Sequence, residues 1–497
     1  MSHPSFEAFH QHPYLILHSL YRFNNTFSMN IITMPSPSPN GRSAGRRSSR
    51  SATRARNSSV SSLQQQAVQK ACHELGGMIE GERSSSTFAC GGTIPIGNME
   101  EGNSPPVTIF WSTDRKPNSK KLVLPLGEEQ DSSPNALKQL VSGCSPATFG
   151  RGEKDVLDQS YRLAGKLNFD QFSSTFHLPS FGILENIEQI LLPSISTADE
   201  NALQFRKLSA DLYKLNVYSG PTGLFRKHVD TPRSANQVGS LVVCLPSPFE
   251  GGNLLVRHQE HEVNFDWGPA SDLSIQWAAF YSDCEHEIKT ITKGDRVTLT
   301  YNLCVTEPVG SLTLPKPIVD IKSLPLYEYL RDLIRQPGFL ADGGALGIFC
   351  SHAYAHSSDT AATNLPRTLK GSDLVFYAVL KSIGIGVNVL PVMDMADWDR
   401  HGEPPSGNCV GNALYSYFTT DEGGYEEEYE SKIAKRCWPY KIRRDITWLT
   451  APKHLEYAFT HLAYGNEAST STQYSYATII AEFPSWNERI RQTFLTS

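Results

Sequence analysis

The chain has 497 residues, with 45 basic and 51 acidic side chains, a formal net charge of −6 and an aromatic content of 10%. This length exceeds what one hydrophobic core usually organises, so it favours two ordered domains and a disordered segment. The small negative net charge gives no indication of a basic surface for phosphates, which argues against nucleic acid as a partner.

The cysteines and the apolar runs predict the cellular compartment in which the protein lies. Nine dispersed cysteines without a Cys-x-x-Cys pair are typical of a reducing environment. No apolar run approaches the roughly 20 residues that span a bilayer, and the apolar stretch from Tyr14 to Leu17 is too short for a signal-peptide core. We therefore expect a soluble, intracellular protein without a membrane partner, cytoplasmic or nuclear, with mitochondria ranked below those two.

Residues 1–66 are predicted to form a disordered leader. From Met34 to Gln66 the chain is rich in Ser and Arg, has no acidic residue and has few large apolar side chains, so it cannot bury enough surface to fold. A nuclear-localisation patch, a phosphorylated tail and a transit peptide all share this composition. Met29 and Met34 also leave open a later translation start.

Residues 67–204 are expected to form a mixed N-terminal supporting region. Gly, Pro and Ser interrupt it repeatedly before the apolar stretch from Phe181 to Leu192. In that stretch isoleucine and leucine side chains recur at helical spacing, which predicts a helix packed on a neighbouring surface.

Residues 205–306 contain many short runs of alternating apolar and polar residues, separated by Gly, Pro and Asp. Closely spaced strands of this kind favour an antiparallel barrel or jelly roll over a parallel sheet with crossover helices. Residues 307–497 form a mixed C-terminal region, with helices expected at Leu326–Arg335 and near Leu374–Ser382. The Gly-, Pro- and Asp-rich segment Asp397–Gly424 is typical of a long loop.

Three side chains in the predicted β-domain form a candidate metal site. His228 and Asp230 are two residues apart in RKHVDTP, so in an extended segment both point to the same face. His286 begins the run HEIKTI, from which a neighbouring strand can bring a second imidazole to the same place. Two imidazoles and one carboxylate on one face of an octahedral Fe(II) leave three positions open for chemistry.

Arg296 follows the turn signal KGD and opens a strand whose alternate residues, Arg296, Thr298 and Thr300, are polar. A buried guanidinium is costly without a partner, so this face predicts a polar pocket that holds the carboxylate of a ligand. Thr298 offers a hydroxyl donor to the same carboxylate, and so does Tyr218, which ends the run DLYKLNVYS. A structural tyrosine with a satisfied hydroxyl is the alternative for Tyr218.

The segments YSGPTGLFRKHVDTP and SDCEHEIKTITKGDRVTLTYNL resemble the iron- and 2-oxoglutarate-dependent oxygenases, closest to the prolyl 4-hydroxylase-like branch and its fungal-type homologues. The resemblance implies an α+β protein with a double-stranded β-helix (jelly-roll) core over 205–306, flanking helices and a mixed C-terminal region. It also implies that His228, Asp230 and His286 bind the iron. Arg296 would hold the distal carboxylate of 2-oxoglutarate with help from Tyr218.

The implied activity is a dioxygenase reaction. Fe(II), 2-oxoglutarate and O2 would hydroxylate a C–H bond of a protein side chain such as proline, or of a small molecule, with ascorbate as an additional candidate cofactor. Two departures accompany the resemblance. Cys244 stands where oxygen-sensing relatives commonly have a second tyrosine, and Arg296 stands where many collagen-type relatives have lysine.

Other histidines allow other sites, and two rival functions remain open. His258 and His261 form a candidate second metal site, although a polar turn is the preferred interpretation. His352 and His356 are four residues apart, as in zinc-binding helices, although a structural pair or a pocket wall is the preferred interpretation. The acidic run at 421–431 is interpreted as a solvated surface. The rivals are a non-catalytic β-barrel scaffold that retains the fold, and a cupin-like metalloenzyme that needs no keto acid.

Overall fold

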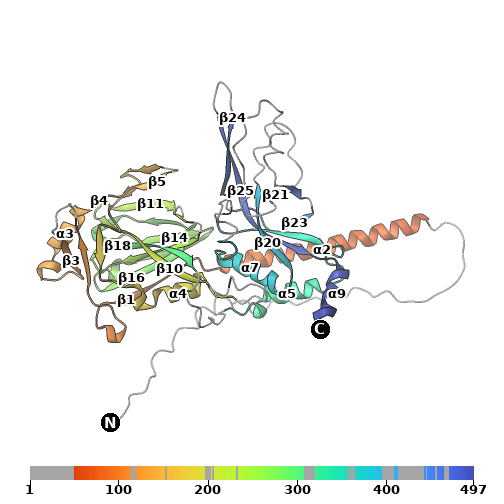
Figure 1. Cartoon of the computed structure of the whole chain (residues 1–497), viewed down its shortest axis with the longest axis horizontal. Coiled ribbons are helices and arrows are strands. Elements are labelled where there is room, and N and C mark those ends of the chain that lie inside the picture. Colours follow the sequence, from red (N-terminus) through yellow and green to blue (C-terminus); the bar gives the residue numbers. More distant parts are fainter. Residues whose placement is uncertain are drawn as a thin grey trace, which may run out of the picture.

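The structure is a computed structural model that describes residues 50–112, 119–151, 154–195, 203, 206–230, 233–234, 236–306, 319–354, 356, 364–393, 408–411, 441–443, 445–453, 456–463 and 469–496. Figure 1 shows a β-rich unit at one end of the molecule and a second, C-terminal unit of helices and strands beside it. None of the helices in these ranges combines the length and apolar character that crossing a bilayer requires.

The β-rich unit contains two larger antiparallel sheets. The eight-stranded sheet has the order β1-β16-β12-β18-β10-β8-β4, with β13 paired to β18, and the five-stranded sheet has the order β15-β14-β17-β11-β7. The strands of the first sheet are β1 (Ala89–Pro95), β4 (Ser145–Pro146), β8 (Gly165–Asn168), β10 (Lys207–Ser219), β12 (Gln237–Cys244), β13 (Phe249–Gly251), β16 (Ser274–Tyr281) and β18 (Ile291–Thr306). Those of the second are β7 (Arg162–Leu163), β11 (Leu224–Val229), β14 (Leu254–His258), β15 (His261–Phe265) and β17 (Glu285–Ile288).

Smaller elements flank these sheets. The strands β2 (Val107–Trp111), β3 (Lys120–Leu124) and β9 (Phe172–Ser174) form a three-stranded sheet, and β5 (Phe149–Arg151) pairs with β6 (Lys154–Val156). The helices of this unit are α3 (Pro134–Gly143) and α4 (Ile183–Leu191). The helix α4 agrees with the one predicted from the apolar spacing, and it buries Ile183, Ile187 and Leu191 in the core of the β-rich unit.

The two larger sheets face each other, and β18 shows how their surfaces differ. On one face of β18 the fully buried side chains Val297 and Leu299 join the apolar core. On the other face Arg296 and Thr298, also buried, lie opposite Tyr218 and Asn216 of β10 in the strand register. Because successive side chains of a strand alternate, the polar residues all turn toward the space between the sheets. The antiparallel sheets of this unit are compatible with the predicted β-rich domain.

The C-terminal unit has one seven-stranded sheet of order β22-β21-β20-β25-β19-β23, with β24 paired to β25. Its strands are β19 (Gly344–Phe349), β20 (Gly386–Met393), β21 (Asn408–Val410), β22 (Lys441–Arg443), β23 (Ile446–Trp448), β24 (Glu456–Ala463) and β25 (Ser469–Phe483). Its helices are α5 (Pro325–Ile334), α7 (Gly371–Ser382) and α9 (Trp486–Thr496). The first two agree with the predicted helices within a few residues. Most of the expected loop at 397–424 lies outside the described residues.

One long helix differs from the sequence-based boundaries. The helix α2 (Arg50–Ser85) begins inside the expected leader, whose residues 1–49 lie outside the described part of the chain. No Pro interrupts the sequence from 50 to 85, and Gln64–Lys70 consists mostly of good helix formers, so a helix can propagate there. Helix α2 runs beside the C-terminal unit (Figure 1), and the buried side chains of Leu75 and Ile79 join the core of that unit. The β-rich unit also extends earlier than residue 205, because β1, β4, β7 and β8 complete its sheets.

Leu299 offers a test of this packing. We expect Leu299→Ala to lower the free energy of unfolding by about 2–5 kcal/mol, since the side chain is fully buried and its removal leaves a cavity. The control is Leu273→Ala, at a side chain that is 67% exposed, which should change stability by less than about 0.5 kcal/mol. Urea unfolding followed by tryptophan fluorescence measures both. Equal effects of the two substitutions would contradict the described burial of β18.

Candidate metal centre

The three predicted metal ligands converge between the two sheets. His228 is the penultimate residue of β11 and lies directly opposite His286 of β17 in the register, with ring centroids 4.1 Å apart. Asp230 follows β11, and one ligand atom from each of the three residues lies within 4.8 Å of the other two. The ring of His286 also packs on Phe280 of the eight-stranded sheet, with centroids 4.6 Å apart. The side chains therefore point inward, as the alternation of the sequence predicts.

Both imidazoles are oriented by the backbone. The Nδ1 atom of His228 lies 2.7 Å from the carbonyl oxygen of Arg226, and that of His286 lies 3.1 Å from the carbonyl oxygen of Cys284. Each Nδ1 therefore carries the proton and donates it, which leaves the lone pair on Nε2 for a metal. Burial and the nearby His286 lower the pKa of His228 to about 3, which keeps this imidazole neutral at physiological pH.

Asp230 supplies the negative charge of the site. Its Oδ2 atom accepts a hydrogen bond of 2.6 Å from the Ser240 hydroxyl, and its Oδ1 atom lies 3.7 Å from Nε2 of His286. Burial opposes the charge of Asp230, yet His286, His228 and the Ser240 hydroxyl together lower the pKa of its carboxyl. Among the described residues, no Lys or Arg forms an ion pair with Asp230. A carboxylate without a Lys or Arg partner beside two imidazole rings suits a divalent cation such as Fe(II).

Arg296 is the most unusual polar group of the inner face. It is 0% exposed, and its Nη1 donates a 2.9 Å hydrogen bond to the carbonyl oxygen of Gly252. Its Nε and Nη2 atoms have no hydrogen-bond partner among the described residues, and none of those residues forms an ion pair with it. The guanidinium lies 4.9 Å from the ring centroid of Trp267 and 6.0 Å from those of Tyr218 and Phe249. An aromatic enclosure with two unused donors fits the carboxylate of a small ligand.

Three other side chains lie around this guanidinium. Tyr218 is 2% exposed and lies opposite Arg296 in the register. The Thr298 hydroxyl donates its proton to the carbonyl oxygen of Asn216 at 3.4 Å, a long bond that it would have to give up in order to donate to a ligand carboxylate as the sequence predicts. Burial raises the pKa of the Cys244 thiol, and the neighbouring Arg296 opposes that rise. A thiol is only a weak acceptor, so Cys244 does not replace the missing anion.

Sequence reasoning did not identify Arg162 as a residue of this site. Its side chain is buried, stands 4.3 Å from the ring centroid of Phe225, and donates a 2.9 Å hydrogen bond to the Asn216 amide oxygen. Phe225 in turn stacks on His228 with ring centroids 3.5 Å apart. Arg162 also helps to lower the pKa values of His228 and Asp230. Nothing in the sequence around Arg162 marks it, because its partners come from other strands.

The remaining histidines are arranged differently from the zinc-site hypotheses. His258 is buried at the end of β14, whereas His261 is exposed at the start of β15, and the metal-like group that contains His258 has Asp283 and His352 as its other members. No helix contains His352 and His356. The Nε2 of His356 lies 2.6 Å from the Ser475 hydroxyl. The acidic run at 421–431 lies outside the described residues.

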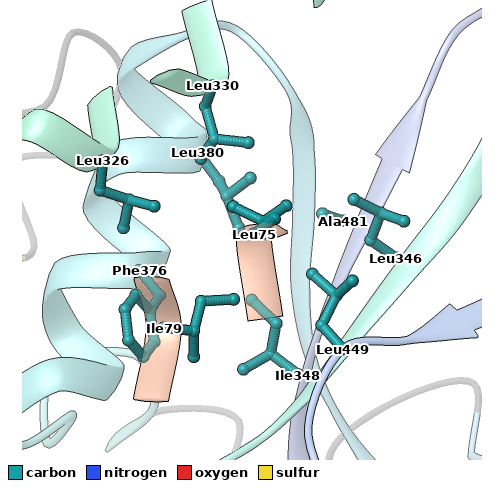
Figure 2. Close-up of a pocket in the computed structure, with 10 residues that line it drawn as sticks. All are labelled: Leu75, Ile79, Leu326, Leu330, Leu346, Ile348, Phe376, Leu380, Leu449 and Ala481. Atoms are coloured by element: carbon teal, nitrogen blue, oxygen red, sulfur yellow. The ribbon is translucent and has the colours of Figure 1, made fainter. Parts of the chain in front are cut away.

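One cavity lies far from these groups, in the C-terminal unit (Figure 2). It is lined only by apolar side chains from α2, α5, α7 and the neighbouring strands, among them Leu75, Leu326, Phe376 and Ala481. It offers no polar group that could orient a ligand, so it is an imperfection of core packing and not a substrate site.

Comparisons with known proteins are limited to structural likeness. Neither a protein-family model nor a curated protein sequence matches the chain. The structure is similar to a prolyl-4-hydroxylase of Pseudomonas putida, at 15% identity and a TM-score of 0.22, over 34% of this chain and 82% of that one. It is also similar to an oxidoreductase of the 2OG-Fe(II) oxygenase family from Burkholderia pseudomallei, at 14% identity and a TM-score of 0.21, over 35% and 80% of the two chains.

A third similar structure is a prolyl hydroxylase of Trichoplax adhaerens in complex with a hypoxia-inducible-factor peptide fragment. The identity is 15%, the TM-score is 0.22, and the match covers 34% of this chain and 73% of that one. The matched part is about a third of this chain at TM-scores near 0.2, so the case for a function depends on the site residues themselves.

Ser240 provides a test of the metal centre. We expect Ser240→Ala to weaken Co(II) binding by roughly 10- to 100-fold, because the hydroxyl orients the Asp230 carboxylate and removing such a partner typically costs that much. Ser274→Ala is the matched control, since Ser274 is also buried but donates to the carbonyl oxygen of Ala270. Titration with Co(II), followed by its visible absorption, measures both. Unchanged affinity in Ser240→Ala would contradict the assigned role of Asp230.

Proposed function

We propose that the protein is a soluble Fe(II)- and 2-oxoglutarate-dependent dioxygenase with a double-stranded β-helix core. One observation carries the proposal: Asp230, a carboxylate without a Lys or Arg partner, accepts a hydrogen bond from Ser240 of β12, and Arg296, a buried guanidinium without an anion, lies on β18, the strand paired with β12. A divalent cation on the first and a dicarboxylate spanning both would satisfy each of them. Among the described residues, no Lys or Arg pairs with Asp230 and no Asp or Glu pairs with Arg296.

His228, Asp230 and His286 would hold the iron through their Nε2 and carboxylate atoms. When bound, the iron with 2-oxoglutarate would supply the oxidising power for hydroxylation of a C–H bond by O2. The contribution of the chain is orientation. The carbonyl groups of Arg226 and Cys284 fix the two imidazoles, and Ser240 fixes the carboxylate. The three ligands then occupy one face and leave the opposite positions open.

Arg296 would bind the distal carboxylate of 2-oxoglutarate. Its unused Nε and Nη2 donors lie on adjacent corners of the planar guanidinium, which matches the two oxygens of a carboxylate. Tyr218 and Thr298 line the same face and would complete the cosubstrate site. The surrounding aromatic rings exclude water, which strengthens the charge-assisted hydrogen bonds.

The substrate would be a protein or peptide side chain, in the manner of a prolyl hydroxylase, or a small molecule. O2 is the other reactant, ascorbate is an additional candidate cofactor, and no nucleic acid or membrane partner is proposed. The net charge agrees with the absence of a polyanionic substrate.

Succinate release tests the activity against the scaffold alternative. With Fe(II) and 2-oxoglutarate, we expect the wild-type protein to release succinate and His228→Ala to fall to background, because a ligand of the metal is lost. His261→Ala, at an exposed histidine of β15, should retain wild-type turnover. Release that is absent from the wild type, or equal in the wild type and His228→Ala, would instead favour a non-catalytic scaffold.

Arg296 tests the need for 2-oxoglutarate against the cupin-like alternative. We expect Arg296→Met to weaken 2-oxoglutarate binding by roughly 10- to 150-fold, since a charge-assisted contact contributes about 1.5–3 kcal/mol. The control Arg257→Met removes an arginine that is paired with Glu262 and Glu287, and it should leave this affinity unchanged. Calorimetric titration of the Co(II)-loaded protein measures both. A cupin-like enzyme predicts full activity in Arg296→Met.

A further inference from the structure

A second group of two histidines and one aspartate lies between the two units. It contains His258 of β14, Asp283 of the turn between β16 and β17, and His352, which follows β19 of the C-terminal unit. All three are at least nine-tenths buried, and the two imidazole rings stack with centroids 4.1 Å apart and an interplanar angle of 12°. By composition the group matches the candidate iron site.

Its charges, however, are already balanced within the chain. Lys370, just before α7, places Nζ 2.8 Å from Oδ1 of Asp283. The other carboxylate oxygen, Oδ2, lies 2.9 Å from Nδ1 of His352 and accepts a hydrogen bond of 3.0 Å from the backbone N–H of Ala353. A divalent cation here would be buried beside the Lys370 ammonium, at an unfavourable excess of positive charge. The charge of Asp283 is therefore already balanced by the Lys370 ammonium. Asp230, in contrast, has no Lys or Arg partner among the described residues.

The Lys370 ammonium is itself fully partnered. Besides Asp283, it donates to the carbonyl oxygen of Ala353 at 3.0 Å and to the Ser282 hydroxyl at 3.4 Å. A second contact holds the same turn, because the backbone N–H of Gly371 donates to the Tyr281 hydroxyl at 3.1 Å. The C-terminal unit thus forms hydrogen bonds with three consecutive residues at the end of β16 and in the turn after it, namely Tyr281, Ser282 and Asp283.

These three residues lie a few positions before His286, one of the three candidate metal ligands. Cys284 follows Asp283, and its carbonyl oxygen is the group that fixes Nδ1 of His286. The position of that carbonyl depends on the turn that Lys370 and His352 hold. Ligand orientation by a hydrogen-bonded neighbour commonly decides metal affinity.

We propose that Asp283 and Lys370 are positioning residues for the metal centre, through which the C-terminal unit orients His286. The proposal rests on the metal site of the proposed function. It makes the C-terminal unit a structural part of that centre. Metal affinity, and not only stability, should then depend on the contact between the units.

Co(II) titration of the full chain tests this inference. We expect one equivalent to bind the wild type, and Lys370→Met to bind it 10- to 100-fold more weakly with an altered Co(II) absorption spectrum. Lys453→Met is the matched control: Lys453 also bridges the units, through Gln259 and Glu80, but it does not touch the turn before His286. It should retain wild-type affinity and spectrum. Thermal unfolding in parallel identifies the temperature at which each variant is folded.

A second variant is needed because Lys370→Met leaves the buried charge of Asp283 without a partner and could unfold the protein for that reason alone. Asp283→Asn with Lys370→Met removes both charges, so it should fold, and it should also bind Co(II) at least tenfold more weakly. Wild-type affinity in either folded variant overturns the proposal, and so does a loss of affinity in Lys453→Met equal to that in Lys370→Met. A second equivalent in the wild type that His258→Ala abolishes overturns it in favour of a metal site. A wild type without Co(II) binding overturns the proposed function as well.

Discussion

A guanidinium buried without an anion is the constraint on which the interpretation of the β-rich unit depends. Arg296 retains one hydrogen bond to a backbone carbonyl, and its other donors face an aromatic enclosure. Unpaired burial of a charge is too costly to persist as a packing accident. The polar residues of the inner face, and the carboxylate of Asp230 beside two imidazoles, are the groups that the proposed function assigns to a charged ligand and a cation.

The two histidine–aspartate groups show that composition alone does not define a metal site. His228, Asp230 and His286 have the same side chains as His258, Asp283 and His352. The difference is the counter-charge, because Lys370 neutralises Asp283 whereas a hydroxyl is the described hydrogen-bond donor to Asp230. A neutralised carboxylate holds protein segments together. A carboxylate without a cation remains able to bind one.

Local patterns in the sequence predicted several of the elements, and the candidate ligands chosen from them lie together in the structure. The helix α4 follows from apolar spacing, which is a property of the segment alone, and α5 and α7 agree with the other expected helices within a few residues. The strand alternation likewise placed Arg296 and Thr298 on a buried polar face. Arg162, Ser240 and Lys370 were not predicted, because their roles arise from contacts between strands and units distant in the chain. The start of α2 within the expected leader was not predicted, since this helix is stabilised by packing of its later residues against the C-terminal unit.

The packing of α2 against the C-terminal unit also determines the order in which parts of the molecule can fold during synthesis. The apolar face of α2 emerges from the ribosome before the whole β-rich unit, while its partners on α5 and α7 are synthesised after it. Until then, Leu75 and Ile79 have no native surface to cover them, and long-range closure of this kind is slow. The C-terminal unit is thus discontinuous in the chain, and a nascent protein must shield α2 from other chains while the β-sheets form.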